Sequence, residues 1–289
     1  MADHDFKNAA EMLSLCDRFG MSISELMLQR EMELGAFSWQ AVMDRVDSCL
    51  RVMEGATKRA GEEPVPSMGG LIGGEAHRLR DLPRDKCVLG KSLHKAVIYA
   101  LAVAETNASM GVIVAAPTAG AAGVLPAALM SLFEDRDISM DALRMAFINA
   151  SAIGYLITRN GSVSGAEAGC QAEVGSASAM AASAVTEALG GTPGQCCHAA
   201  SIALSSLLGL VCDPVGGLVE VPCQTRNTLG VAGAFTAAEL ALAGIESHVP
   251  LDEMIQIVSD VGRGMPAALR ETGLGGCAAA PSVCANCSK

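Results

Sequence analysis

The sequence predicts an all-α protein built as a single large helical domain, and three observations favour this class. Apolar residues recur at spacings of three and four, and no long run alternates with the period of two that a strand requires. Aromatic residues make up only 3% of the sequence although 51% is hydrophobic, so small and aliphatic side chains must fill the core. The abundant Ala and Gly suit helices packed at short range. We assign residues 1–275 to this domain and 276–289 to a flexible, cysteine-containing C-terminal tail.

The first predicted helices carry clear start signals. Ser22-Ile-Ser-Glu25 is a capping box, in which two side chains bind each other's backbone amides, and it opens a helix toward Leu34. Ser38 can cap a longer helix to about Ala60, since apolar residues then recur at helical spacing. The segment 61–74 holds two prolines and five glycines and is expected to be an ordered loop.

Two loops rich in Gly and Pro, at 116–126 and 212–223, separate apolar helices in the rest of the chain. Within the second loop, 218–221 is expected to form a short extended piece. Helices are expected near 138–158, 166–188, 197–211, 227–246 and 251–261.

The charge balance excludes one class of partner. The net charge is −11 and the sequence pI is about 4.9. Nucleic-acid binding needs a basic face for the phosphates, so nucleic acid is not an expected partner.

A membrane protein is also not expected. The stretches 106–133 and 188–212 lack charged residues, but prolines and glycines interrupt both, and a span needs about 20 predominantly apolar residues. We therefore expect buried helices and loops. Residues 2–5 do not resemble the basic start of a signal peptide, so we expect a cytoplasmic location.

The chain has 11 cysteines, an odd number that argues against a disulfide framework. Two of them, Cys212 and Cys223, bracket a loop in which glycines allow close backbone approach and Pro222 removes a backbone donor. By spacing alone, two buried cysteines beside a structural turn are the favoured interpretation. A soft-metal or iron–sulfur site, with a third thiolate from elsewhere, is the alternative.

Cys170 lies among small residues. Ser164 and Glu167 form a predicted capping box that puts Cys170 in the second turn of a helix. The small side chains that follow leave room beside the thiol for a bulky inorganic cluster. A tight crossing of two helices through the same Gly/Ala face is the competing interpretation.

Three long strings resemble those of the iron–sulfur L-serine dehydratases, in particular the α chain of the two-chain form. They are GSVSGAEAGCQAEVGSASAMAA, CDPVGGLVEVPCQTRN and APTAGAAGVLPA. SELMLQREMEL and GGLIGGEA are similar to weaker N-terminal signatures of that family, and the resemblance covers nearly the whole chain. Glu75 stands where the family commonly has an aspartate.

The resemblance implies an all-helical fold and a [4Fe–4S] cluster held by Cys170, Cys212 and Cys223, with one iron open to substrate. It implies that L-serine is dehydrated and deaminated to pyruvate and ammonia, the open iron acting as a Lewis acid without electron transfer. The family's catalytic histidine lies in a Ser-Ser-His-Thr stretch that this sequence lacks. We therefore expect a separate β chain to complete the active site in a hetero-oligomer.

Four further residues are candidate catalytic residues. Arg226 and Asn227 follow Cys223 and can grip the substrate carboxylate, which a guanidinium binds bidentately, although a structural or surface arginine is an equal alternative. Thr118 and Ser162 lie in Gly-rich loops and can donate hydroxyl hydrogen bonds to substrate, or only to the turns around them.

The tail supplies two further candidate metal ligands. In single-chain members of the family a C-terminal cysteine occupies the open iron until substrate displaces it. By that resemblance Cys284 or Cys287 is expected to reach the cluster. Their Cys-Ala-Asn-Cys spacing is also typical of zinc or redox sites, but only weakly without a second pair.

Three rival functions remain at the level of sequence. A related iron–sulfur L-cysteine desulfidase shares the mechanism. A pyridoxal-phosphate lyase would need a Schiff-base lysine, and no lysine lies in a matching motif. A non-enzymatic helical scaffold, with inert cysteines, is the third.

Overall fold

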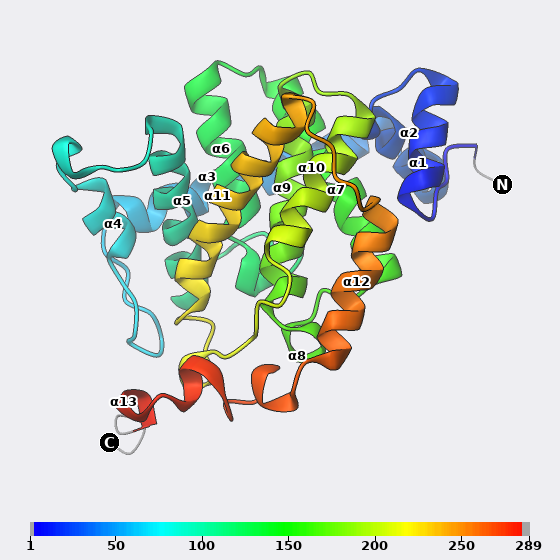
Figure 1. Cartoon of the computed structure of the whole chain (residues 1–289). Coiled ribbons are helices and arrows are strands. Elements are labelled where there is room, and N and C mark those ends of the chain that lie inside the picture. The colour runs from blue at the N-terminus through cyan, green and yellow to red at the C-terminus, as the bar shows by residue number, and fades with distance from the viewer. Residues whose placement is uncertain (1–2, 285–289) are drawn as a thin grey trace.

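The structure, a computed structural model, describes residues 3–284 and confirms the all-α class. Within that range no strand forms, and an isolated parallel bridge joins Cys212 to Arg270. No helix there is both long and apolar enough to cross a membrane. The helices of Figure 1 are α1 (Ala9–Phe19), α2 (Ile23–Gly35), α3 (Trp39–Glu62), α4 (Glu75–Arg80), α5 (Lys91–Ala108), α6 (Val124–Arg136), α7 (Met140–Asn160), α8 (Gly165–Ala168), the π-helical segment Gln171–Gly175, α9 (Ser176–Ala188), α10 (Pro193–Ser206), α11 (Cys223–Leu242), α12 (Leu251–Gly264) and α13 (Pro281–Cys284).

The N-terminal start signals are confirmed. The Ser22 hydroxyl accepts a hydrogen bond from Glu25 N at 3.2 Å, and Ser22 N donates to Glu25 Oε2 at 2.8 Å, so α2 opens on a complete capping box. Ala41 N donates to Ser38 Oγ at 3.2 Å at the start of α3. That helix ends at Glu62, close to the expected end.

Small residues allow the central helices to pack closely. Helix α9 lies in the middle of the bundle against α7, α10 and α11, and all of 176–186 is buried (Figure 1). A Cβ on Gly230 of α11 would lie 2.8 Å from methyl groups of Val124 and Val174. Overpacking of that kind typically costs about 1–3 kcal/mol, which explains the absence of a side chain at this crossing.

The helix predicted over 166–188 is wrong as a single element. Ser164 makes no side-chain cap, and its N–H donates to Ser162 Oγ at 3.1 Å while that hydroxyl donates to the Glu167 carboxylate at 2.6 Å. Gly169 has φ = 74° and ends α8 after one turn. The chain then continues through the π-helical segment into α9. The Ser–Glu spacing was therefore a misleading local signal.

The helix predicted over 197–211 begins earlier and ends earlier, at Pro193 and Ser206. Thr192 and Gln195 form a capping box, and Pro193 occupies the first turn, where its missing N–H costs nothing. The Gly/Pro signal before Cys196 marks the start of a helix rather than a loop.

The 212–223 loop contains turns where an extended piece was expected. The prediction of an extended piece at 218–221 is wrong, because Glu220 N donates to Leu218 O at 2.8 Å and turns the chain. Helix α11 begins at Cys223, also earlier than expected. This loop, α8 and the segment after α12 lie at one end of the bundle, where the predicted site residues are concentrated (Figure 1).

Candidate metal centre

Cys170 lies directly after a backbone turn that only glycine makes easily. Gly169 has a left-handed φ of 74°, and a Cβ there would lie 2.7 Å from Leu210 O. Gln171 N donates to Leu210 O at 3.0 Å, which fixes the start of the π-helical segment. The thiol is thus held at a helix start, not in the second turn of a helix as predicted.

Cys212 is held by the chain that follows α12. Cys212 N donates to Leu269 O at 2.9 Å, and Glu271 N donates to Cys212 O at 2.6 Å. These two bonds form the isolated bridge with Arg270. The thiol therefore faces the centre from a backbone fixed on both sides.

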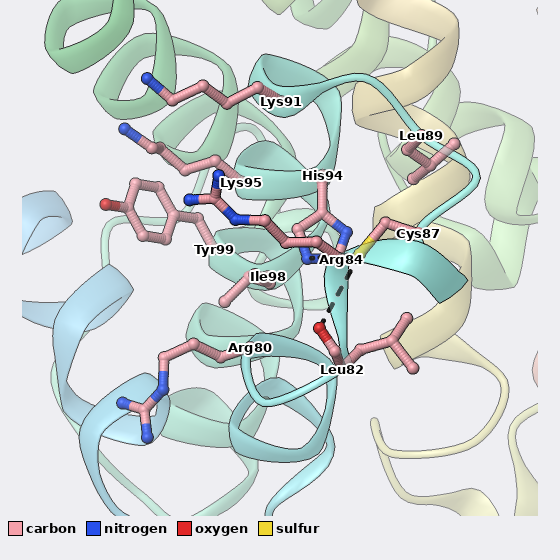
Figure 2. Close-up of a pocket in the computed structure, with 10 residues that line it drawn as sticks. All are labelled: Arg80, Leu82, Arg84, Cys87, Leu89, Lys91, His94, Lys95, Ile98 and Tyr99. Carbon is pink, nitrogen blue, oxygen red and sulfur yellow. Dashed lines mark hydrogen bonds between the residues drawn. The ribbon is translucent and has the colours of Figure 1, made fainter.

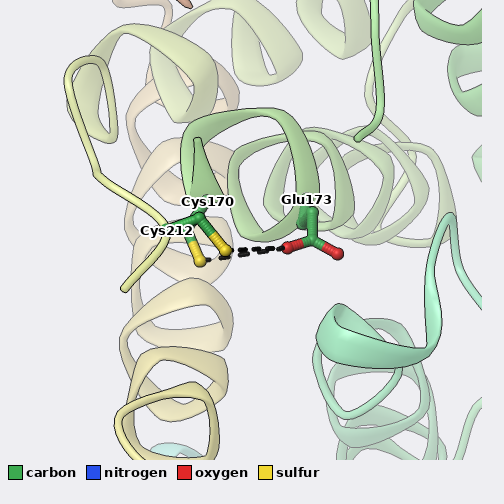
Figure 3. Close-up of side chains that lie close together, drawn as sticks. All are labelled: Cys170, Glu173 and Cys212. Atoms are coloured by element: carbon green, nitrogen blue, oxygen red, sulfur yellow. Dashed lines mark hydrogen bonds between the residues drawn. The ribbon is translucent and has the colours of Figure 1, made fainter. Parts of the chain in front are cut away.

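The two thiols meet at a carboxylate. Ligand atoms of Cys170, Glu173 and Cys212 lie within 4.8 Å of one another, and Glu173 Oε2 is 3.9 Å from each sulfur (Figure 3). The Thr118 hydroxyl donates to Glu173 Oε1 at 2.7 Å. A Cβ on Gly165 would lie 2.8 Å from the Cys212 sulfur, so glycine leaves room for the group.

Cys223 lies at the start of α11 and is buried, and it is near enough to Cys170 and Glu173 for their charges to act on its thiol. Burial, together with the nearby charges of Cys170 and Glu173, raises the pKa of its thiol to about 12. It is not part of the close group. A cubane holds its ligands on different iron atoms, so its cysteines need not touch one another.

The pKa shifts of the three groups disfavour their simultaneous ionisation. A hydrogen bond from Cys212 lowers the pKa of Cys170, while the same bond and burial raise the pKa of Cys212. Burial also raises the pKa of Glu173. These groups cannot all be charged by themselves, whereas metal ligation requires thiolates. A soft metal or iron–sulfur cluster fits this donor set.

One cation already borders the thiols. Arg226 Nη1 lies 3.7 Å from the Cys170 sulfur and donates to Val211 O at 2.8 Å. The same atom lies 2.7 Å from Asp213 Oδ1, and Asp213 is only 2% exposed. Arg226 therefore contacts the candidate ligand set directly, and it is held by the Val211 carbonyl and by its ion pair with Asp213.

The described part of the tail packs on this ion pair. Cys277 N donates to Asp213 Oδ2 at 2.6 Å. Gly276 has φ = 61°, and a Cβ there would overlap the Asp213 carboxylate. The flexibility expected of the tail stays a prediction. Cys287 and the side chain of Cys284 lie outside the described residues.

The other two candidate residues have different surroundings. Asn227 is buried and accepts from Gly123 N at 2.9 Å. Its amide donates to Gly120 O and Cys223 O, each at 2.8 Å, so Asn227 joins the 116–126 loop to the start of α11. The Ser162 hydroxyl donates to Glu167 Oε2 at 2.6 Å and accepts from Ser164 N at 3.1 Å.

A buried carboxylate outside the predicted site residues fixes a further loop. Glu220 is 2% exposed and accepts hydrogen bonds from Ser67 Oγ at 2.8 Å, Gly69 N at 2.7 Å and Leu71 N at 3.0 Å. Glu105 fixes the start of α4 in a similar way, since its carboxylate accepts hydrogen bonds from the backbone amides of Gly74 and Ala76. Glu75, the residue that departs from the family pattern, accepts from Gly73 N and Gln224 Nε2.

Three of the missed residues had a usable signal, because they lie within the motif strings that resemble the family. Glu173 follows Cys170 by three positions, Asp213 is next to Cys212, and Glu220 lies between the two loop cysteines. An acidic residue inside a largely apolar string needs a partner when it is buried.

A separate cavity of about 750 Å³ lies over α4 and α5 (Figure 2). Lys95 pairs there with Asp135 at 2.6 Å and with Glu134 at 3.1 Å, and Cys87 Sγ lies 4.0 Å from His94 Nε2. None of the predicted site residues lines this cavity, so its size does not mark the metal centre. Its basic lining residues are Arg80, Arg84, Lys91, His94 and Lys95.

Comparison with known proteins decides the family. The model of the family described as "Serine dehydratase alpha chain" matches residues 18–278. The chain belongs to the serine dehydratase α-chain family. It is 45% identical over 278 residues to the probable L-serine dehydratase, alpha chain, of Bacillus subtilis, covering 96% of this chain and 92% of that protein.

Two more relatives differ in length: one is named alpha chain and the other is a longer protein. The L-serine dehydratase, alpha chain, of Peptoniphilus asaccharolyticus is 44% identical over 272 residues, covering 93% of each chain. The L-serine dehydratase of Streptomyces coelicolor is 39% identical over 284 residues, covering 95% of this chain but only 61% of that longer protein. This serine dehydratase α chain thus matches part of a longer relative and nearly all of the relatives named alpha chain.

Proposed function

We propose that this chain is the α chain of an L-serine dehydratase, an ammonia-lyase that converts L-serine to pyruvate and ammonia. The observation that carries the proposal is the meeting of Cys170, Cys212 and Glu173 in a buried centre of a serine dehydratase α chain. Relatives named L-serine dehydratase match along almost the whole chain.

The proposed cofactor is a [4Fe–4S] cluster held by Cys170, Cys212 and Cys223. When bound, it would supply an open iron as a Lewis acid for oxygen atoms of the substrate. The thiols are buried and come from three separate segments. A tail cysteine, Cys284 or Cys287, stays our candidate for an exchangeable ligand.

The protein groups around this site would bind and orient the amino acid. Arg226 places positive charge beside Cys170, where it can attract the substrate carboxylate. Thr118 holds Glu173 by one carboxylate oxygen and leaves the other toward the thiols. Asn227 positions the 116–126 loop through backbone groups. Ser162 is the least supported candidate, since its hydroxyl is engaged by Glu167.

A separate β chain is proposed to complete the active site. The sequence lacks the Ser-Ser-His-Thr stretch of the family. The relatives of similar length are named alpha chain, and the longer Streptomyces relative has a further region that this chain does not match. The complex is expected to work in the cytoplasm.

Iron and sulfide analysis of protein purified without oxygen tests the cofactor. We expect about four irons and four sulfides per chain, as for one cubane. Cys170→Ala, Cys212→Ala and Cys223→Ala should each lose most of this iron. Cys197→Ala is the matched control, because Cys197 is equally buried but lies in the helical core. Full iron content in all three ligand variants would refute the assignment.

Substrate assays of the same preparation test the reaction. Mixed with its β chain, the α chain should release pyruvate from L-serine, and each chain alone should be nearly inactive. Release of sulfide from L-cysteine without turnover of L-serine would identify a desulfidase instead. A colourless, iron-free protein would favour the scaffold interpretation.

A further inference from the structure

Four large apolar side chains are exposed at the edge of the metal centre. Met68 and Leu71 are 74% and 47% exposed, and Leu218 and Val219 are 43% and 37% exposed. We call these four residues the 68/219 patch. Single exposed apolar residues are ordinary, but a group of them on adjoining loops typically marks a binding surface.

The two loops that carry the 68/219 patch form one fixed unit. Glu220, the neighbour of Val219, binds the backbone amides of Gly69 and Leu71. A Cβ on Gly69 would overlap the side chain of Leu218, so the loops are in direct contact. Met68 N also donates to the end of α5 at Ala108 O, 3.0 Å away. A surface ordered in advance loses little conformational entropy on binding.

The 68/219 patch adjoins the thiol centre. A methyl group of Val219 lies 3.6 Å from the point where Gly120 would carry a Cβ, and Glu173 Oε1 lies 3.1 Å from the same point. Glu173 in turn contacts both thiols. A protein bound to the 68/219 patch would therefore lie close enough for its side chains to extend to the thiol centre.

We propose that the 68/219 patch is the docking surface for the β chain, a protein partner with an apolar contact face. This inference rests on the proposed function. A longer relative carries the matched region and a further region in one polypeptide, so the two regions can share an interface within one molecule. A second copy of this chain would add another thiol centre, whereas the β chain would correspond to the further region that the longer relative carries.

The patch is expected to be the apolar centre of a larger contact. A specific interface covers about 800 Å² on each partner, and a few central residues dominate its affinity. The surrounding loops and the segment after α12 would form its rim.

Binding of the purified β chain from the same organism tests the proposal. The Met68→Asp, Leu218→Asp double variant should bind it at least about 30-fold more weakly, because two charges would be buried at an apolar contact. Val88→Asp is the matched control, since Val88 is 96% exposed on a different loop, and it should bind like the native chain. Circular dichroism and iron content should be unchanged in both variants.

The outcomes separate this inference from the proposed function. If the double variant binds the β chain like the native chain, the docking surface is wrong even if the complex turns over L-serine. If the double variant loses only self-association, the patch is an interface between copies and the proposal is overturned. Failure of the proposed function appears elsewhere, as a native complex without iron or without serine turnover.

Discussion

Arg226 Nη1 lies 2.7 Å from Asp213 Oδ1, and the two side chains are only 12% and 2% exposed. This buried ion pair joins three parts of the centre. Arg226 contacts the sulfur of Cys170, Asp213 is next to Cys212 in the chain, and the backbone of Cys277 donates to the same carboxylate. Both ends of the pair therefore hold elements that carry candidate ligands.

We predict that Arg226→Gln destabilises the protein by about 3–5 kcal/mol, because it leaves the Asp213 carboxylate buried without its cation. Arg226→Lys should cost less, since it keeps the charge but not the planar fork. Urea unfolding under nitrogen measures both. In a double-mutant cycle with Asp213→Asn, strictly additive effects would show that the pair is not coupled.

Gly165→Ala should remove most of the bound iron. The new Cβ would lie 2.6 Å from Glu173 Oε2 and 2.8 Å from the Cys212 sulfur, so the ligand group must shift. Overpacking should also cost about 1–3 kcal/mol of stability. Gly55→Ala is the matched control, because nothing lies within 4 Å of its added Cβ and alanine favours a helix. Equal iron content in the two variants would contradict the crowding argument.

Glu220→Gln should loosen the 67–72 loop without unfolding the helices. The carboxylate accepts from three donors, whereas an amide would present its own N–H groups to some of them, at a cost of about 1–3 kcal/mol. Hydrogen exchange at Gly69 and Leu71 should become faster. Glu246→Gln changes an exposed residue and should leave exchange at both amides unaltered.

Ionisation of the buried Glu187 should lower the free energy of unfolding as pH rises. Burial raises the pKa of its carboxyl group above the ordinary 4.5, against hydrogen bonds from Ser24 and Asn149. Between the unfolded and the raised folded pKa the folded state holds more protons, so stability is lost as pH rises through that window. Glu187→Gln cannot ionise and lacks this loss.

The measurement for Glu187 is the difference in unfolding free energy between native chain and Glu187→Gln. It should shift in favour of the variant as pH rises from about 4.5 toward neutrality. A difference that stays constant over this range would show that the carboxyl group is not perturbed by folding.

Much of the fold follows from local signals. The capping box at Ser22, the cap at Ser38 and the apolar spacing in α3 each act within a few residues, and the structure contains all three. The Gly/Pro-rich loops were also recognisable, because proline and glycine limit or widen backbone conformation whatever surrounds them. These features needed no knowledge of distant residues.

Competing local signals were harder to rank. Ser164 and Glu167 have the spacing of a capping box, but Ser162 takes the Glu167 carboxylate, and Gly169 turns the chain before Cys170. Thr192 makes the box that was not predicted. Which of two similar hydrogen bonds forms depends on how the helices meet, and spacing alone does not contain that information.

The sequence by itself determined the helical class, the positions of the main loops and the family to which Cys170, Cys212 and Cys223 point. Only the tertiary structure decided that Glu173 lies between two thiols, that Asp213 pairs with Arg226, and that Glu220 joins two loops. The physical reason is burial. A carboxylate removed from water must find donors or cations, and those partners come from segments far away in the chain.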